Sequence, residues 1–414
     1  MPVPVPPPAL TGSGSRGRSR PGTSQPRRAA PPGCGPDYEA DAGLWQGRPR
    51  FIGSDIYRRR SYGGKHPLAI PRVSTVIDLC RALGWLPDAV YIDSPVATPA
   101  QLVRFHDPAY VDALQRAEAT QRVDAETRRR HHLGAKGNPV HGKVFSRPAT
   151  ACGATLAAAA MLLDGAAIVH SPAGGTHHGR PDRASGFCYL NDPVLGILAL
   201  LDGGLDRVAY VDVDAHHCDG VEDAMAGEDR VLTISIHERG RWPNSGGASR
   251  YDRASGGGGA INLPVPAGFN DSDMDLLMDR VLLPALDRFR PQAVILQCGA
   301  DGLLEDPLSK LALSNLAIWG VVRALRPLAP RLLVLGGGGY NPWAVGRCWT
   351  GIWALLNDIE IPDRLPAAAE QVLRGVTWSR SAGRNPPDHW FTTLADSPRP
   401  GPIDDAVREL VNPS

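Results

Sequence analysis

Short apolar runs alternate with stretches of helical spacing along most of this 414-residue chain. The apolar runs are rich in valine, isoleucine and leucine and carry few polar residues, a pattern typical of strands buried on both faces of a sheet. They predict strands at Arg50–Ser54, Val90–Asp93, Ala166–His170, Val208–Asp214, Val231–His237, Ala293–Cys298 and Leu332–Leu335.

The stretches between these runs predict helices at Ser74–Leu86, Ala149–Leu163, Asp192–Leu201, Asp273–Phe289, Asn315–Leu328 and Arg347–Asn357. Ser74 and Asp273 are suitable N-cap residues, because their side-chain oxygens can accept hydrogen bonds from the first helical turn. Alternating strands and helices predict an α/β fold with a central parallel sheet and helices on both faces. No internal repeat or linker interrupts the pattern, so residues 50–414 are predicted to be one domain with an irregular C-terminal extension.

The first 49 residues differ from the rest. They are rich in proline, glycine and arginine, with no acidic residue before Asp37 and no aromatic residue before Tyr38. Such a segment buries too little apolar surface to offset its ordering entropy, so we expect a disordered tail. It lacks the apolar core of a secretory signal, and whether it belongs to the mature protein stays open.

Composition is that of an ordinary soluble enzyme, with 43% hydrophobic and 21% charged residues. A net charge of +1 gives no reason to expect nucleic acid or an anionic membrane as partner. No apolar run approaches the roughly 20 residues of a membrane span. The seven cysteines are scattered and odd in number, which is typical of reduced thiols in a cytoplasmic protein.

Asp212, Asp214 and His216 stand at a spacing of two after a valine-rich run. On a continuous strand all three side chains would leave on one side, near its carboxyl end. Two carboxylates and an imidazole resist burial unless a cation or hydrogen-bond partners compensate them. Mixed oxygen and nitrogen ligands suit Zn²⁺, with Fe²⁺ or Mn²⁺ as alternatives. A hydrogen-bonded polar strand end without metal is the other interpretation.

Three more predicted strands are followed by segments that carry chemically active side chains, namely His177 with His178, then Asp301, then Tyr340. In parallel α/β sheets ligands bind outside the carboxyl ends of the strands, so these four strand ends are predicted to meet at one pocket. Each motif has a plainer interpretation, because a histidine pair can be structural and the glycine run before Tyr340 can be a flexible loop. Their joint placement favours a site.

These residue types suit hydrolysis. Asp214, His216 and Asp301 would make a three-ligand metal site with one position left for water or a carbonyl oxygen. The histidine pair fits general acid–base work, with Asp212 and Asp219 as orienting partners. The tyrosine behind the glycines could donate a hydrogen bond to a developing oxyanion.

The stretches GGTHHGRPDRASGFCYLND, YVDVDAHHCDGVED, LTISIH, LQCGADGLLEDPL and LGGGGYN resemble the histone deacetylase superfamily. The resemblance is closest to its bacterial acetoin-utilisation (AcuC-type) branch, and runs from about Phe51 to near Pro366 in family order. It implies the arginase/deacetylase α/β fold and a zinc hydrolase that removes acetyl groups from lysine ε-amides in proteins.

The resemblance also implies a role for each matching residue. The zinc ligands would be Asp214, His216 and Asp301, and a structural K⁺ would be held by Asp212, Asp214, His216, Ser235 and Ile236. His178 would be the general base and acid, oriented by Asp219; His177 would be its partner, oriented by Asp212; Tyr340 would polarise the amide carbonyl. The acyl-lysine tunnel would be lined by Gly186, Phe187, Trp242 and Leu308, with Arg72 in an acetate channel.

The chain departs from the family at three positions. Thr176 replaces an aromatic residue of the eukaryotic enzymes, Cys218 replaces a glycine, and the rim aspartate falls near Gly137. Three other functions stay open: an acetylpolyamine amidohydrolase, which would want an acidic gate near Leu308; a manganese ureohydrolase, which would want more carboxylates near Asp301; and an acyl-binding module. The physiological substrate, the native metal and the oligomeric state are left open as well.

Overall fold

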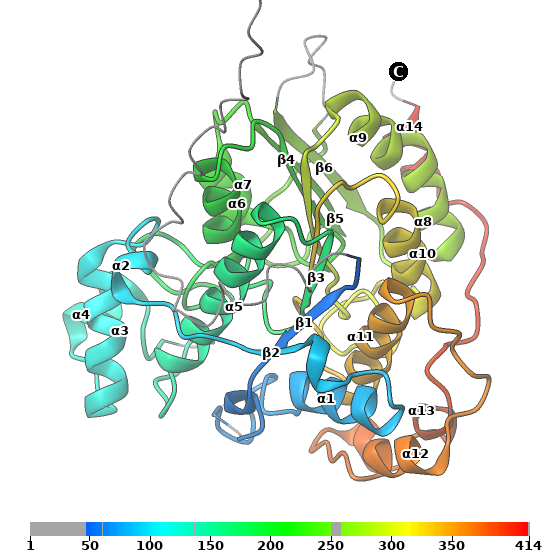
Figure 1. The fold of residues 1–414 in the computed structure, drawn as a ribbon, viewed down its shortest axis with the longest axis horizontal. Coiled ribbons are helices and arrows are strands. Elements are labelled where there is room, and N and C mark those ends of the chain that lie inside the picture. The colour runs from blue at the N-terminus through cyan, green and yellow to red at the C-terminus, as the bar shows by residue number, and fades with distance from the viewer. Residues whose placement is uncertain (1–46, 60, 136, 250–257, 413–414) are drawn as a thin grey trace, which may run out of the picture. The chain divides into compact units, whose positions relative to one another are not determined.

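The computed structural model describes residues 47–59, 61–135, 137–249 and 258–412. Among them eight strands form one sheet with the order β2-β1-β3-β8-β7-β4-β5-β6 (Figure 1). Every pair of neighbouring strands runs parallel. The strands are β1 Arg50–Gly53, β2 Tyr91–Asp93, β3 Ile168–Ser171, β4 Val208–Asp212, β5 Val231–Glu238, β6 Gly259–Val265, β7 Ala293–Gln297 and β8 Leu332–Leu335.

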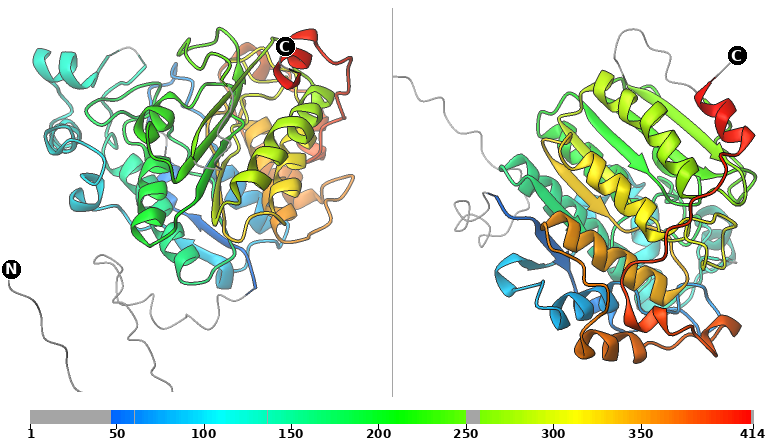
Figure 2. Two further views of the ribbon diagram at one scale, coloured as in Figure 1. Left: turned by 90° about the horizontal axis from the view of Figure 1, so that it is seen from above. Right: turned by 90° about the vertical axis from the view of Figure 1, so that its right-hand side faces the viewer.

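Helices cover both faces of this sheet, with α5 and α6 on one side and α1, α10 and α11 on the other (Figure 2). The helices are α1 Val73–Ala82, α2 Pro99–Leu102, α3 Pro108–Thr120, α4 Ala125–His131, α5 Ser146–Leu163, α6 Asp192–Asp202, α7 Asp219–Met225, α8 Asp271–Leu277, α9 Leu283–Phe289, α10 Asn315–Leu325, α11 Pro342–Leu356, α12 Ala367–Arg374, α13 His389–Thr392 and α14 Asp405–Val411. The predicted fold class is therefore confirmed. None of the described helices is long and apolar enough to cross a membrane.

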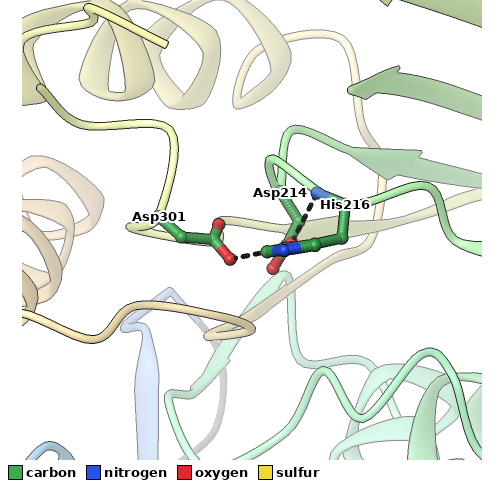
Figure 3. A group of neighbouring side chains, drawn as sticks. All are labelled: Asp214, His216 and Asp301. Carbon is green, nitrogen blue, oxygen red and sulfur yellow. Dashed lines mark hydrogen bonds and ion pairs between the residues drawn. The ribbon is translucent and has the colours of Figure 1, made fainter. Parts of the chain in front are cut away.

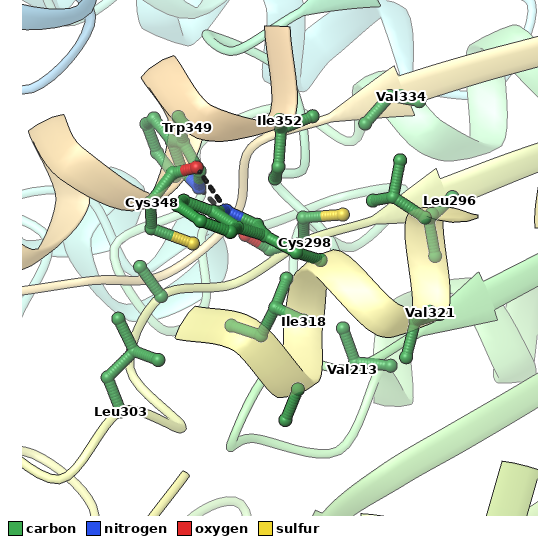
Figure 4. Packing of buried hydrophobic residues seen from close by; sticks show 14 of the residues in the cluster. Val213, Leu296, Cys298, Leu303, Ile318, Val321, Val334, Cys348, Trp349 and Ile352 are labelled. Atoms are coloured by element: carbon green, nitrogen blue, oxygen red, sulfur yellow. Dashed lines mark hydrogen bonds between the residues drawn. The ribbon is translucent and has the colours of Figure 1, made fainter. Parts of the chain in front are cut away.

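Tryptophan side chains fasten α11 and α10 to the sheet next to the predicted site (Figure 4). The indole N–H of Trp349 donates to the carbonyl of Cys298, directly after β7, at 2.8 Å. The indole N–H of Trp319 donates to the carbonyl of Cys348 at 2.9 Å, joining α10 to α11. A buried tryptophan contributes a large apolar surface and needs a partner for its N–H, and both conditions are met here. The chain just before Asp301 is thus held by a rigid core.

One strand lies outside the predicted set. β6 has the sequence GAINLPV, and its Pro264 argues against a central strand. The strand is last in the sheet order and pairs only with β5, so a residue without an N–H is tolerated there. Edge placement accounts for the missed prediction.

Helix starts differ from the predicted positions. α1 begins one residue before Ser74, and its N-cap is Arg72. The next predicted cap, Asp273, stands at the third position of α8, where its carboxylate accepts from the backbone N–H of the true N-cap, Asn270. The predicted helix to Phe289 changes to π-helical register at Met278–Leu282 (η4) before α9. Pro284, which has no N–H to donate, accounts for that change.

The predicted tail, residues 1–49, lies almost wholly outside the described residues. The predicted C-terminal extension contains α12, α13 and α14 joined by irregular segments. A buried ion pair at 2.8 Å between Arg347 of α11 and Asp396 ties this extension to the rest.

Candidate active site

Four neighbouring strands carry the predicted site segments. β3, β8, β7 and β4 stand next to one another in the sheet order. Because these strands are parallel, the segments that follow them leave at the same edge of the sheet. Strand order, which the sequence pattern did not give, is therefore what brings the histidine pair, the tyrosine and the acidic residues together.

Asp214, His216 and Asp301 form a compact buried cluster (Figure 3). Their ligand atoms all lie within 4.8 Å of one another. His216 Nδ1 lies 2.9 Å from Asp301 Oδ2 and 3.2 Å from Asp214 Oδ1. β4 ends at Asp212, so the expectation that one strand presents Asp214 and His216 by its pleat is wrong, and a loop presents them instead.

The electrostatics of this cluster fit a cation. Burial and the neighbouring Asp214 raise the pKa of Asp301. Burial opposes a charge on His216, but its bonds to Asp214 and Asp301 raise its pKa to about 10. Two buried carboxylates in contact are costly unless positive charge neutralises them, and a divalent metal would do so. A three-ligand set of one histidine and two aspartates suits Zn²⁺ or Fe²⁺.

Glycines make room for the cluster. A Cβ on Gly338, in the run after β8, would lie 2.1 Å from Asp301 Oδ2. A Cβ on Gly299 would lie 2.3 Å from Asp214 Oδ2. The backbone N–H of Gly338 donates to that same Asp214 oxygen at 2.6 Å. The glycine run is thus a wall of the site, because only glycine allows such close backbone approach.

Each histidine of the pair has a carboxylate behind it. His177 Nδ1 lies 2.7 Å from Asp212 Oδ2, and His178 Nδ1 lies 2.7 Å from Asp219 Oδ1. The two Nε2 atoms lie 2.9 Å apart, so one of them donates to the other. This contact offers a path for a proton between the two rings.

The two rings differ in basicity. Burial opposes a charge on His177, but the Asp212 and Asp214 carboxylates raise its pKa to about 9. Burial and the adjacent His177 lower the pKa of His178 to about 3. A neutral His178 with its Nδ1–H on Asp219 presents an unprotonated Nε2, the form that a general base needs.

Arg180 and Asp192 are among the supports of the histidine pair that sequence reasoning missed. Arg180 Nη2 binds Asp219 Oδ2 at 2.5 Å. Although burial opposes ionisation, the bonds from His178 and Arg180 lower the pKa of Asp219 to about 2. The carboxylate of Asp192 accepts the N–H and the hydroxyl of Thr176, just before the pair. An arginine two residues after His178 was the one available signal.

Aromatic side chains surround the approach to the cluster. The ring of Trp242 lies 4.6 Å from that of His178 and 6.4 Å from that of His216. Tyr340 lies 6.0 Å from Phe187 and 6.4 Å from His216, again between ring centroids. Trp242 is 43% exposed and Tyr340 only 7%, so the aromatic set leads from solvent inward.

Among the other predicted pocket residues, Gly186 has φ +52°, and a Cβ there would lie 2.3 Å from the Trp242 ring. Leu308 is half-buried. Arg72 donates from Nη1 to the carbonyl of Gly337 at 2.7 Å, so it lies behind the glycine wall. Its guanidinium also stacks 5.4 Å from the Trp349 ring.

Comparison with known proteins decides the family. The family model described as "Histone deacetylase domain" matches residues 66–356. The chain belongs to the histone deacetylase family. It is 36% identical over 312 residues to histone deacetylase 9 of Arabidopsis thaliana, which covers 74% of this chain and 72% of that protein. It is 36% identical over 299 residues to histone deacetylase 8 of Xenopus tropicalis, covering 71% and 80%.

Solved structures agree. The crystal structure of an HDAC homologue complexed with SAHA superposes with a TM-score of 0.83 at 34% identity, covering 88% of this chain and 99% of that one. The structure of an HDAC homologue from Aquifex aeolicus gives the same values. The chain is thus a hydrolase of the histone deacetylase family, and a deacetylase activity is supported.

Of the residues predicted to hold potassium, Asp212, Ser235 and Ile236 lie on two adjacent strands, whereas Asp214 and His216 lie in the loop after β4. Asp212 of β4 is in register with Ser235 of β5, and Ile236 follows Ser235. The Ser235 hydroxyl lies 2.9 Å from His237 Nδ1, and Asp212 Oδ1 accepts the N–H of Asp214 at 2.9 Å. A K⁺ site in this member of the histone deacetylase family stays a prediction.

Gly137, near which the resemblance predicts the family's rim aspartate to fall, has φ +92°. Its carbonyl lies 3.2 Å from His66 Nε2, and a Cβ there would lie 3.4 Å from the Phe187 ring. The neighbouring Asn138 is turned inward and accepts from the N–H of Phe187 at 3.1 Å. Neither residue offers a carboxylate to substrate. Cys218, the other departure, is buried at the start of α7.

Proposed function

We propose that this protein is a zinc-dependent deacetylase that hydrolyses the acetyl amide of N-ε-acetyl-lysine in proteins. The observation that carries the proposal is the buried Asp214–His216–Asp301 cluster beside a carboxylate-partnered histidine pair. Zn²⁺ would be held by the cluster, with Fe²⁺ as the alternative, and K⁺ by Asp212, Asp214, His216, Ser235 and Ile236. We place the enzyme in the cytoplasmic AcuC-type branch; its six described cysteines, all free and buried, suit a reducing compartment.

When bound, the metal would polarise the amide carbonyl and lower the pKa of water. His178 accepts the proton of the attacking water at Nε2, while Asp219 and Arg180 hold the ring in place. The Tyr340 hydroxyl donates to the negative charge that develops on the amide oxygen. No covalent bond to the protein is needed.

The leaving amine needs a proton. His177 keeps one readily, because the carboxylate of Asp212 raises its pKa. Burial and the charged His177 ring, whose Nε2 lies 2.9 Å from that of His178, lower the pKa of His178, so His178 holds the proton that it has taken up only weakly. His178 then delivers that proton to the lysine nitrogen as the amide bond breaks.

Acetyl-lysine is favoured over an acetylpolyamine by the acidic groups near Leu308. A polyamine would need a free carboxylate for its distant ammonium, but Glu305 binds Arg399 at 3.0 Å. Asp306 is buried, and both of its oxygens accept backbone N–H groups. In this part of the described chain no carboxylate is left for a second cation.

The test is acetate release by the purified, metal-loaded full chain from an acetyl-lysine peptide and from N-acetylputrescine, measured side by side. We expect a higher kcat/KM on the peptide and inhibition by SAHA, which a structural relative binds. Much faster turnover of acetylputrescine would assign the polyamine activity instead. A metal-loaded chain that releases acetate from neither substrate would point to an acyl-binding module.

A further inference from the structure

Asp306 joins two segments of the site through its side chain. Its Oδ2 accepts the backbone N–H of Tyr340 at 2.6 Å, and its Oδ1 accepts the backbone N–H of Leu308 at 2.9 Å. The residue is 5% exposed. One buried carboxylate thus connects the loop after β7 with the residue that ends the glycine run after β8.

The position of the Tyr340 hydroxyl depends on this connection through Asp306. Among the described residues the hydroxyl has no hydrogen-bond partner, so only the backbone and the ring contacts direct it. The backbone before it is glycine, with Gly337 at φ +121° and Gly339 at φ +134°. Glycines carry no side chains that packing could hold, and they are the most permissive residues of the chain.

Other links between the two segments lie to either side of Tyr340. The N–H of Ala300 donates to the carbonyl of Gly338 at 2.9 Å. Asn341 Nδ2 donates to the carbonyl of Glu305 at 3.3 Å, a long bond. The short bond from Asp306 is the one that acts on Tyr340 itself.

We propose that Asp306 is a positioning residue, which sets where the Tyr340 hydroxyl stands relative to the metal cluster and to Leu308. The inference rests on the proposed function, in which that hydroxyl meets a developing oxyanion. A donor must lie within about 2.7–3.1 Å of the oxyanion position. A displacement of about 1 Å can cost about 10²-fold in rate.

Asp306→Asn tests the connection with the smallest change in shape. Both carboxylate oxygens already accept an N–H, so an amide NH₂ in place of either oxygen faces a donor. Glu305→Gln is the matched control, because it makes the same carboxyl-to-amide change one residue earlier. The Glu305 carboxylate binds Arg399 and makes no bond to the glycine run or Tyr340.

A double-mutant cycle on acetyl-lysine peptide gives the kinetic result. With metal content and circular dichroism unchanged, we expect Asp306→Asn to lower kcat by about 10- to 10²-fold. KM should change far less. In a Tyr340→Phe background the same change should cost less than about twofold, because its effect passes through the hydroxyl. Equal losses in both backgrounds, or a loss matched by Glu305→Gln, would overturn the proposal.

Hydrogen exchange at the Tyr340 amide gives a result that does not depend on turnover. We expect faster exchange in Asp306→Asn than in the parent and no change in Glu305→Gln. Unchanged exchange would show that Asp306 does not hold Tyr340. If the parent released no acetate but exchange rose, the proposed function would fail and the connection would stand. Should Asp306→Asn not fold, Asp306→Glu, which keeps the charge but moves the oxygens, takes its place with the same criteria.

Discussion

Two groups of buried histidines in this protein have opposite surroundings. His177 and His178 each place Nδ1 against a carboxylate. His106 bonds only to backbone: its Nδ1 donates to the carbonyl of Arg180 and its Nε2 accepts the N–H of Asn191, both at 3.0 Å. All three rings are at most 5% exposed, so burial alone does not distinguish them.

The difference shows what makes a buried histidine reactive. A carboxylate behind Nδ1 fixes the tautomer and stabilises the imidazolium, while leaving Nε2 to exchange a proton. Two backbone partners use up both nitrogens of His106, and burial lowers its pKa to about 4. His170 is similar, with Nδ1 bound to the carbonyl of Val334 and its pKa lowered by burial to about 4. The surroundings of His106 and His170 thus fit a structural role, and those of His177 and His178 fit the proposed proton transfer.

The largest effect is expected from Asp301→Ala, which removes one carboxylate of the metal cluster next to the histidine pair. Three protein ligands leave no spare, so metal binding and turnover should both be lost. Metal analysis of the purified protein and acetate release measure this. Asp202→Ala, at an exposed carboxylate paired with Arg104, is the control that should keep both. A full metal equivalent with near-normal turnover in Asp301→Ala would remove the residue from the site.

His178→Ala breaks the carboxylate-bound group directly. We expect kcat to fall by about 10²- to 10⁴-fold, the range for a general acid–base, while the bound metal remains. The matched change in the other group is His106→Gln, whose amide can donate and accept as the ring does. It should keep kcat within about threefold. Similar kcat losses in both variants would erase the distinction between the two groups.

Tyr340→Phe should fold normally and lose about 10²- to 10³-fold in kcat, because the hydroxyl acts on charge formed in the transition state. The ring contacts with Phe187 and His216 are kept in this variant. Steady-state kinetics with a thermal melt as control measure it. A kcat within about threefold of the parent would make the tyrosine a pocket wall only.

The backbone-bound group predicts a stability change with pH. The pKa of His106 is near 4 when folded and about 6.5 when unfolded, so between these values the unfolded state binds the extra proton. Stability is therefore lost as pH falls from about 6.5 towards 4. From pH 7.5 to 5.5 this histidine should cost about 1.4 kcal/mol. Urea unfolding at both pH values should show a smaller loss of unfolding free energy in His106→Gln than in the parent. An equal loss in the two proteins would contradict the assignment of this pH dependence to His106.

The smallest effect concerns the rim, where Gly137 and Asn138 offer no carboxylate to substrate. We therefore expect no charge-assisted hydrogen bonds between a rim carboxylate and the backbone N–H groups of the peptide, each of which would be worth about 1.5–3 kcal/mol. KM for an acetyl-lysine peptide should then lie within about tenfold of that for a small acetyl-amide. Much tighter peptide binding would mean that another residue grips the backbone. Gly137→Asp would introduce a rim carboxylate but would strain the backbone, because residues with a side chain disfavour φ +92°.

Much of the fold followed from the sequence because buried parallel strands and amphipathic helices carry local patterns. β8 lies where its apolar run predicted, and the HH pair and Asp301 follow their strands as expected. The roles of these residues came from family resemblance, since a histidine pair or a GAD tripeptide says little alone.

The sheet order and the contacts between distant segments leave no local pattern in the sequence. The sheet order that makes β3, β8, β7 and β4 neighbours depends on packing across the whole chain. Arg72 reaches the carbonyl of Gly337, which is 265 residues away in sequence. The bond from Asp306 to the Tyr340 backbone joins two loops, and no spacing rule predicts it. Such contacts depend on tertiary placement, which propensity and periodicity do not determine.

We propose that the buried cluster and the carboxylate-bound pair together hydrolyse acetyl-lysine with a metal. The most direct test of this proposal is acetate release from an acetyl-lysine peptide before and after chelation, then after one equivalent of Zn²⁺ is added back. We expect turnover to be lost with the metal, to return with Zn²⁺, and to stay absent in His178→Ala although that variant retains the metal. Turnover that continues in protein shown by analysis to hold no metal would contradict it.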